Sequence, residues 1–171
     1  MPKAIMRAPQ PAAALWFGGT RAEARAETMA RSDHVSQPSD STRIAGARVL
    51  VVEDEEDARD LLITLLEECG MEVRSAPSVA AGMEEFRGFR PEVVLSDIGM
   101  PVEDGYSLAR RIRSLPTADG GDTPMLALTA FAGNDDRERA RAAGFNAHLA
   151  KPVEPAELLD VLGTVLAGVR G

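Results

Sequence analysis

From Ala47 onward, hydrophobic and polar residues alternate along this chain with two distinct periods. Short, nearly continuous apolar runs such as ARVLVV, EVVLSD and MLALTA have the length of strands buried on both faces of a parallel sheet. The runs between them repeat apolar residues at the spacing of amphipathic helices. The predicted strands cover residues 47–52, 71–76, 92–97, 125–130 and 146–150, and the predicted helices cover residues 57–69, 79–89, 106–115, 135–143 and 154–168.

This regular alternation of strands and helices predicts an α/β fold. Parallel strands need crossover connections, and helical crossovers cover both faces of the sheet. Right-handed crossovers leave few topologies, foremost the flavodoxin-like (βα)5 doubly wound parallel sheet with strand order 2-1-3-4-5. We therefore predict one such domain over residues 47–168, with no second domain after it.

Residues 1–46 lack this pattern. They are rich in Ala, Arg, Ser and Pro, and the polar stretch 33–41 is typical of an unstructured, turn-forming segment. Residues 21–32 have the composition of a weak helix. The apolar run at residues 12–19 is short and interrupted by glycine, which argues against a signal peptide. Residues 1–46 are thus predicted to be a disordered or weakly helical N-terminal leader.

The amino-acid composition argues against several functions and locations of the protein. The net charge of −8 at pH 7 argues against direct nucleic-acid binding, which depends on clustered Lys and Arg. The single cysteine, Cys69, excludes an intramolecular disulfide and suits a reducing compartment. Because no apolar run is long enough for membrane insertion, a cytoplasmic location is expected.

Polar residues occur where the predicted strands end. Glu53 and Asp54 follow the first strand, and Asp97 ends the third. Thr129 lies at the end of the fourth strand, and Lys151 follows the fifth. Ligands of open parallel sheets bind beyond the carboxyl ends of the strands, so we expect these residues to meet there. Each of them alone has a structural explanation as a cap, strand or solvated residue, but together they indicate a site.

The residue types at this rim favour phosphoryl transfer. Three crowded carboxylates resist full ionisation unless a cation joins them. Oxygen ligands without His or Cys favour Mg²⁺, with Mn²⁺ as a substitute, over Zn²⁺. A threonine hydroxyl and a lysine ammonium can bind phosphoryl oxygens, and a carboxylate can act as a nucleophile toward phosphorus.

The motifs VLVVEDEED, PEVVLSDIGMPVEDGYSL, PMLALTA and AHLAKPV follow one another in this order over residues 47–167. They resemble the receiver domains of response regulators, the CheY-like family of two-component signalling. The segment GFNAHLAKPVEPAEL is similar to receivers of hybrid sensor kinases. The resemblance implies that Asp97 accepts a phosphoryl group from a histidine kinase or a histidine phosphotransfer protein. It implies a stand-alone receiver that contacts an unknown target protein or relays the phosphate, without turnover of a separate substrate.

The same resemblance implies roles for the other rim residues. Asp54 would bind Mg²⁺ directly, Glu53 would bind it directly or through water, and the main-chain carbonyl of Gly99 would supply a further ligand. Lys151 would pair with the phosphoryl group, and its peptide bond to Pro152 would be cis.

Some positions depart from the usual residues of the family. Glu53 replaces the commoner Asp. His148 occupies the place of an aromatic switch residue, where it would rotate inward with Thr129 or act as a partly buried spacer, and a pH-dependent role is an open alternative. Gly99 and Phe131 lie where side chains influence access of water to the acyl phosphate, which predicts a slowly hydrolysing phosphoform.

Two other functions are compatible with the pattern. A degenerate receiver would bind partner proteins without being phosphorylated. An aspartyl-phosphate hydrolase of the haloacid dehalogenase type would also use an aspartate after a buried strand. Such hydrolases need a second acid two residues later, however, and this chain has Gly99 there.

Overall fold

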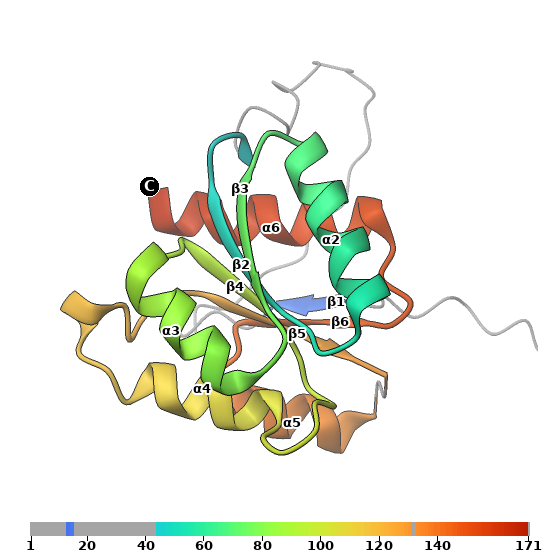
Figure 1. Cartoon of the computed structure of the whole chain (residues 1–171). Helices are drawn as coiled ribbons and strands as arrows, with labels where there is room; N and C mark the ends of the chain where they lie inside the picture. The colour runs from blue at the N-terminus through green and yellow to red at the C-terminus, as the bar shows by residue number, and fades with distance from the viewer. Residues whose placement is uncertain (1–12, 16–43, 131–132, 171) are drawn as a thin grey trace, which may run out of the picture.

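The computed structural model describes residues 13–15, 44–130 and 133–170, so the predicted helix at 21–32 and Phe131 lie outside the described residues. At its centre is a six-stranded sheet in the order β1-β6-β5-β4-β2-β3 (Figure 1). Its strands are β1 Ala13–Leu15, β2 Arg48–Val52, β3 Glu72–Ala76, β4 Val93–Asp97, β5 Met125–Thr129 and β6 Ala147–Ala150.

A helix follows each of the parallel strands. These helices are α2 Glu56–Glu68, α3 Val79–Phe89, α4 Gly105–Arg113, α5 Asn134–Ala143 and α6 Pro155–Arg170, with a short 3₁₀ helix η1 at Thr117–Asp119. The parallel strands lie in the order β3-β2-β4-β5-β6, which is the predicted order 2-1-3-4-5 when β2 is counted as the first strand. The predicted flavodoxin-like fold is therefore confirmed. No helix in the described part of the chain combines the length and apolarity that a bilayer span requires.

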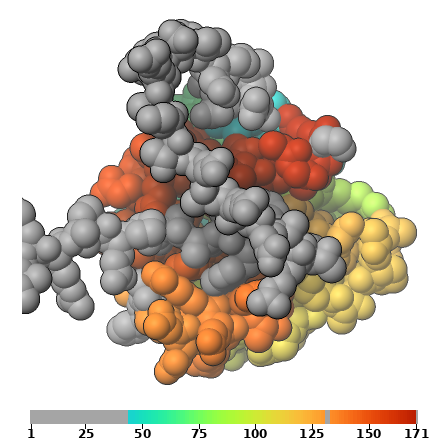
Figure 2. Space-filling model, turned by 180° about the vertical axis from the view of Figure 1, so that it is seen from behind, coloured from blue at the N-terminus to red at the C-terminus, as the bar shows by residue number. Residues whose placement is uncertain are grey.

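Two helical layers cover the sheet, with α2 and α6 on one face and α3, α4 and α5 on the other (Figure 1). Successive strand residues point to opposite faces. Val49 and Val51 accordingly belong to the core under α2 and α6, whereas Leu50 and Val52 belong to the core under the other three helices. Seen from behind in Figure 2, α6 (red) lies above α5 (orange), with α4 (yellow) beside α5.

The part of the chain before Ala47 contributes two features that the sequence analysis did not predict. β1 pairs antiparallel with β6 and adds a sixth strand at that edge of the sheet. Ile44 is only 2% exposed and belongs to the core under α2 and α6. The packed core thus begins at least three residues before the predicted boundary.

The first helix departs from its predicted apolar stripe at one position. The sequence places Leu61, Leu62, Leu65 and Leu66 at helical spacing. Leu62 and Leu66 are buried and Leu65 packs against them, but the side chain of Leu61 is 70% exposed. Leu61 therefore faces solvent on the outer surface of α2.

The helix ends follow the expected local chemistry. Ser78 caps α3, since its Oγ accepts a hydrogen bond from the Ala81 N–H at 3.2 Å. Asp104 caps α4 in the same way, through the Ser107 N–H at 2.8 Å. Gly144 ends α5 with φ at 110°, the left-handed conformation that glycine adopts most readily.

Glu92 is expected to make the stability of the domain depend on pH. Its carboxylate accepts hydrogen bonds from the Arg170 guanidinium at 2.8 and 3.1 Å, and these lower the pKa of Glu92 below its ordinary value of 4.5. A lowered pKa in the folded state contributes stability above the ordinary pKa, and this is lost as the pH falls through the folded-state pKa. Glu92→Gln should therefore reduce the free energy of unfolding at pH 7, by less than about 1 kcal/mol because the pair is partly exposed. Urea denaturation at pH 7 and pH 3 tests this, and an undiminished difference between variant and wild type at pH 3 would contradict it.

Candidate functional site

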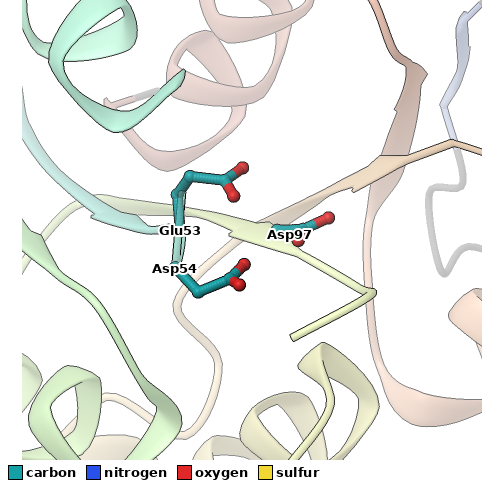
Figure 3. Close-up of side chains that lie close together, drawn as sticks. All are labelled: Glu53, Asp54 and Asp97. Carbon is teal, nitrogen blue, oxygen red and sulfur yellow. The ribbon is translucent and has the colours of Figure 1, made fainter. Parts of the chain in front are cut away.

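Three carboxylates meet at the carboxyl ends of β2 and β4. One carboxylate oxygen from each of Glu53, Asp54 and Asp97 lies within 4.8 Å of the other two. Glu53 is 1% exposed and Asp97 6%, whereas Asp54 is exposed to solvent. Figure 3 shows Glu53 and Asp54 extending from the end of one strand toward Asp97 at the end of the next. The cluster therefore has two buried members and one that opens to water.

Lys151 joins this cluster from the end of β6. Its Nζ lies 2.8 Å from Glu53 Oε2 and 3.1 Å from Asp97 Oδ1. The lysine side chain is 27% exposed, so its charge is partly withdrawn from water. One ammonium thus bridges the two buried carboxylates and leaves Asp54 outside these ion pairs.

Burial and charge act in opposite directions on these groups. Burial raises the pKa of Glu53, and the nearby Asp97 charge adds to this, although the hydrogen bond from Lys151 partly offsets the effect. Burial lowers the pKa of Lys151, but hydrogen bonds to Glu53 and Asp97 more than compensate, so its pKa lies above the ordinary value. The lysine is therefore cationic at neutral pH and offsets part of the negative charge.

Strand register explains why Glu53 and Asp97 are neighbours. Val52 of β2 is paired with Ser96 of β4, so the next residue on each strand lies across from the other at the end of the sheet. The Glu53 carboxylate also accepts a hydrogen bond from the Glu55 N–H at 3.2 Å. The register of the sheet thereby brings Glu53 and Asp97 side by side, and the turn before α2 holds the Glu53 carboxylate.

Arg59 on α2 is a site-supporting residue that the sequence analysis missed. Its guanidinium donates hydrogen bonds to the main-chain carbonyls of Glu53 at 2.9 Å and Asp54 at 3.4 Å. These contacts hold the backbone that carries two of the three acids. No sequence pattern identifies such a contact, because an arginine that donates to a nearby main-chain carbonyl cannot be told from a solvated helical arginine by sequence.

Gly105 is a second residue with an unpredicted role. Its N–H donates a hydrogen bond to the Ile98 carbonyl at 3.0 Å. A Cβ atom at this position would lie 2.3 Å from the Asp97 carbonyl oxygen and 3.0 Å from the Ile98 Cα. The start of α4 therefore approaches the backbone of Asp97 so closely that only glycine fits.

Thr129 follows Leu128, the β5 residue that is paired with Asp97, and His148 lies on β6. Thr129 is 9% exposed, and its carbonyl accepts a hydrogen bond from the Lys151 N–H at 2.8 Å. His148 is 1% exposed, and both residues line one small pocket together with Ile98 and Tyr106. His148 is thus fully buried and not partly buried as expected for a spacer, and its role as a switch stays a prediction.

The loop after Asp97 is open around Gly99. Gly99 is exposed, and a Cβ atom added to it would have no neighbour within 4 Å. The peptide bond between Lys151 and Pro152 is cis. Because Phe131 lies outside the described residues, the predicted slow hydrolysis of a phosphoform stays a prediction.

The donor set is suited to a hard divalent cation. The cluster contains only carboxylate oxygens, without the His or Cys ligands that zinc prefers. The charges are also complementary, since Lys151 neutralises one of the three acids and a divalent cation would balance the other two. The cluster therefore fits Mg²⁺, as the sequence predicts, and Mn²⁺ has the same ligand preference.

Comparison with known proteins identifies the family of the chain. A family model for the response regulator receiver domain matches residues 49–163. An uncharacterized 14.6 kDa protein in the sodA1 3′ region of Leptolyngbya boryana is 41% identical over 119 residues, which are 70% of this chain and 89% of that protein. Hybrid signal transduction histidine kinase D of Dictyostelium discoideum is 29% identical over 134 residues. That match covers 75% of this chain but only 9% of the kinase.

A similar receiver domain has been solved with a metal ion in its active site cleft. The receiver domain of sensor histidine kinase PA1611 from Pseudomonas aeruginosa, solved with a magnesium ion coordinated in its active site cleft, matches with a TM-score of 0.66. It is 34% identical, and the match covers 72% of this chain and 99% of that domain. Receiver domains of this kind are signalling modules that interact with histidine kinases or phosphotransfer proteins. The chain belongs to the response regulator receiver family of two-component signalling.

Proposed function

We propose that the protein accepts a phosphoryl group on Asp97 in a Mg²⁺-dependent reaction, with a histidine kinase or histidine phosphotransfer protein as donor. The observation that carries this proposal is the pairing of a buried Asp97 with Lys151 beside two further acids. A buried carboxylate paired with one lysine is a nucleophile whose partner cation is already in place. The phosphoprotein would then signal by contact with a target protein or pass the phosphoryl group on.

Transfer of the phosphoryl group to Asp97 is a single displacement at phosphorus. A carboxylate oxygen of Asp97 forms a bond to phosphorus while the bond from phosphorus to the donor's histidine nitrogen breaks, and that nitrogen keeps the electron pair. Lys151, 3.1 Å from Asp97 Oδ1, is placed to pair with a phosphoryl oxygen. Thr129 at the end of the neighbouring strand would donate a hydrogen bond to another phosphoryl oxygen.

Mg²⁺, when held by Glu53, Asp54, Asp97 and the Gly99 carbonyl, would neutralise the charge on the phosphoryl oxygens. Of these, Asp54 is the carboxylate outside the lysine ion pairs, and it opens to solvent. Glu53 already binds Lys151 at 2.8 Å, which favours contact with the metal through its second oxygen or through water. Asp54 is therefore expected to be the principal side-chain ligand besides Asp97.

Phosphorylation by a small donor tests the proposal. The full chain is incubated with acetyl phosphate and Mg²⁺, digested, and its phosphorylated peptide identified by mass spectrometry. The expected product carries one phosphoryl group on Asp97. A phosphoryl group on another residue, or an unmodified chain, would contradict the proposal and favour a receiver that binds partners without phosphorylation.

Two exposed hydrophobic side chains, on segments that directly follow the two strands carrying the acids, are expected to contact the phosphodonor protein. Among the described residues, the exposed large hydrophobics are Leu61, Val102 and Val169, at 70%, 105% and 46%. Leu61 lies on α2, which follows the Glu53–Asp54 pair, and Val102 lies in the loop after Asp97. Val102 also has φ at 71°, a strained conformation for a β-branched residue, of the kind that clusters at functional sites.

Leu61→Asp should therefore slow phosphotransfer from any histidine kinase that phosphorylates the wild type, by about tenfold if Leu61 is a central contact. The rate of labelling by acetyl phosphate, which needs no protein docking, should stay unchanged. Val169→Asp on α6 serves as the control, because Val169 lies with Pro91 and Glu92 at the opposite end of β4 from Asp97. Equal transfer rates for wild type and Leu61→Asp would remove Leu61 from the docking surface.

A further inference from the structure

The two edges of the sheet are protected in different ways. β3 forms one edge, and it carries the charged residues Glu72 and Arg74, of which Arg74 pairs with Glu85 at 3.2 Å. Charged side chains on an edge strand discourage pairing with a strand of another molecule. The free edge of the domain at β3 is therefore protected by its own residues.

β6 lacks this protection. Its sequence is AHLA, which contains no Asp, Glu, Lys or Arg. Ala147, His148 and Leu149 are at most 1% exposed. Without β1, the outer edge of β6 would present unpaired main-chain N–H and C=O groups on an apolar strand, which is a template for strand pairing. In this structure β1 covers that edge, with Ala13, Ala14 and Leu15 opposite Leu149, His148 and Ala147 (Figure 1).

The hydrogen-bond direction along β6 identifies the central pair. The Lys151 N–H donates to the Thr129 carbonyl of β5 at 2.8 Å. Main-chain groups of successive strand residues face opposite edges, so those of Leu149 also face β5 and those of His148 face β1. Ala14 and His148 are therefore the pair that exchanges main-chain hydrogen bonds, whereas the N–H of Ala13 faces away from β6.

We infer that the β6 edge is a strand-docking surface. Residues 13–15 of the same chain occupy this edge and thereby prevent a second copy of the chain from pairing with it. The cover is short, a strand of three residues joined to Ile44 by residues 16–43. Because this strand makes so few main-chain pairs with β6, it separates from β6 at low free-energy cost. β6 leads directly into Lys151, so the occupant of this edge also braces the strand that carries the lysine of the site.

This inference depends on the sheet alone and stands whether or not Asp97 is phosphorylated. Ala14→Pro in the full chain removes the N–H that faces His148, and proline in a strand disrupts pairing on that side. Ala13→Pro is the matched control, because the N–H it removes faces away from β6 and proline is tolerated at such an edge position. Circular dichroism is measured on both variants first, and spectra that match wild type are expected because neither substitution touches the core of the domain.

Two readouts on these proteins test the inference. Hydrogen exchange at the His148 amide should be at least about tenfold faster in Ala14→Pro than in wild type, and close to wild type in Ala13→Pro. Sedimentation should show Ala14→Pro associating with rising concentration under conditions where wild type and Ala13→Pro stay monomeric. Unchanged exchange at His148 would show that β1 does not cover the edge. Faster exchange without association would show that the uncovered edge is not a docking surface, and either result overturns the inference.

Discussion

Replacing Asp54 with asparagine is expected to weaken the binding of Mg²⁺ by about tenfold or more, which corresponds to at least about 1.4 kcal/mol of binding free energy. Asp54 is the exposed member of the acidic cluster, and Lys151 binds the other two acids but not this one. The substitution removes a full negative charge from a hard-cation site while keeping nearly the same shape. Calorimetric titration of the wild type and the variant with MgCl₂ measures the effect.

Asp57→Asn provides the control for this experiment. Asp57 lies in the first turn of α2, is exposed, and does not belong to the acidic cluster. It changes the net charge of the protein by the same amount, so it reports the long-range electrostatic contribution alone. Should both variants lose the same affinity for Mg²⁺, the ion would respond to overall charge and not to a ligand at Asp54.

Replacing Gly105 with alanine is expected to destabilise the domain by about 1–3 kcal/mol, the usual cost of overpacking a well-packed site. The new Cβ would lie 2.3 Å from the Asp97 carbonyl oxygen, which is much closer than any ordinary contact. Relief requires the start of α4 or the backbone at Asp97 to move. The variant should therefore also be phosphorylated more slowly by acetyl phosphate, and urea denaturation with parallel labelling measures both effects.

Gly88→Ala makes the same chemical change where there is room for it. Gly88 lies within α3, is exposed, and a Cβ there would have no neighbour within 4 Å. Alanine is the better helix former, so this variant should gain up to about 1 kcal/mol of stability. If Gly105→Ala proves as stable as Gly88→Ala, the close approach of α4 to Asp97 is not a constraint on the fold.

The parallel sheet could be predicted from the sequence because its strands are buried on both faces. Val49 to Val52 form an uninterrupted apolar run, and all four side chains are inaccessible to solvent in the structure. The meeting of Glu53, Asp54 and Asp97 followed from a topological rule, since the carboxyl ends of adjacent parallel strands share one rim. Lys151 reaches the same rim for this reason, and its contact with both buried acids was not evident from spacing alone.

Features that depend on a single long-range contact could not be predicted in this way. β1 is three residues long, which is too short to show a period, and its partner strand lies more than a hundred residues away. Ile44 precedes the first parallel strand by only a few residues, and nothing in its sequence neighbours indicates that it belongs to the core under α2 and α6. The exposure of Leu61 was missed because a leucine next to a buried stripe has the same sequence signature as a member of it.

Gly105 illustrates a different limit. The Asp104–Gly105 pair before a helix is typical of a cap followed by a turn, and Asp104 does cap α4. The steric reason for the glycine lies in the backbone of Asp97, eight residues earlier, which approaches only in the folded sheet. Close approach between main-chain segments leaves no pattern of hydrophobicity or charge.

The most direct test of the central claim is the phosphorylated fraction of the intact protein after incubation with acetyl phosphate. Wild type and Asp97→Asn are compared, each with Mg²⁺ and with EDTA in its place, and the mass of the intact chain is measured. We expect wild type with Mg²⁺ to gain one phosphoryl group and the other three samples to stay largely unmodified. Equal modification of Asp97→Asn, or of wild type in EDTA, would contradict a metal-dependent phosphoacceptor at Asp97.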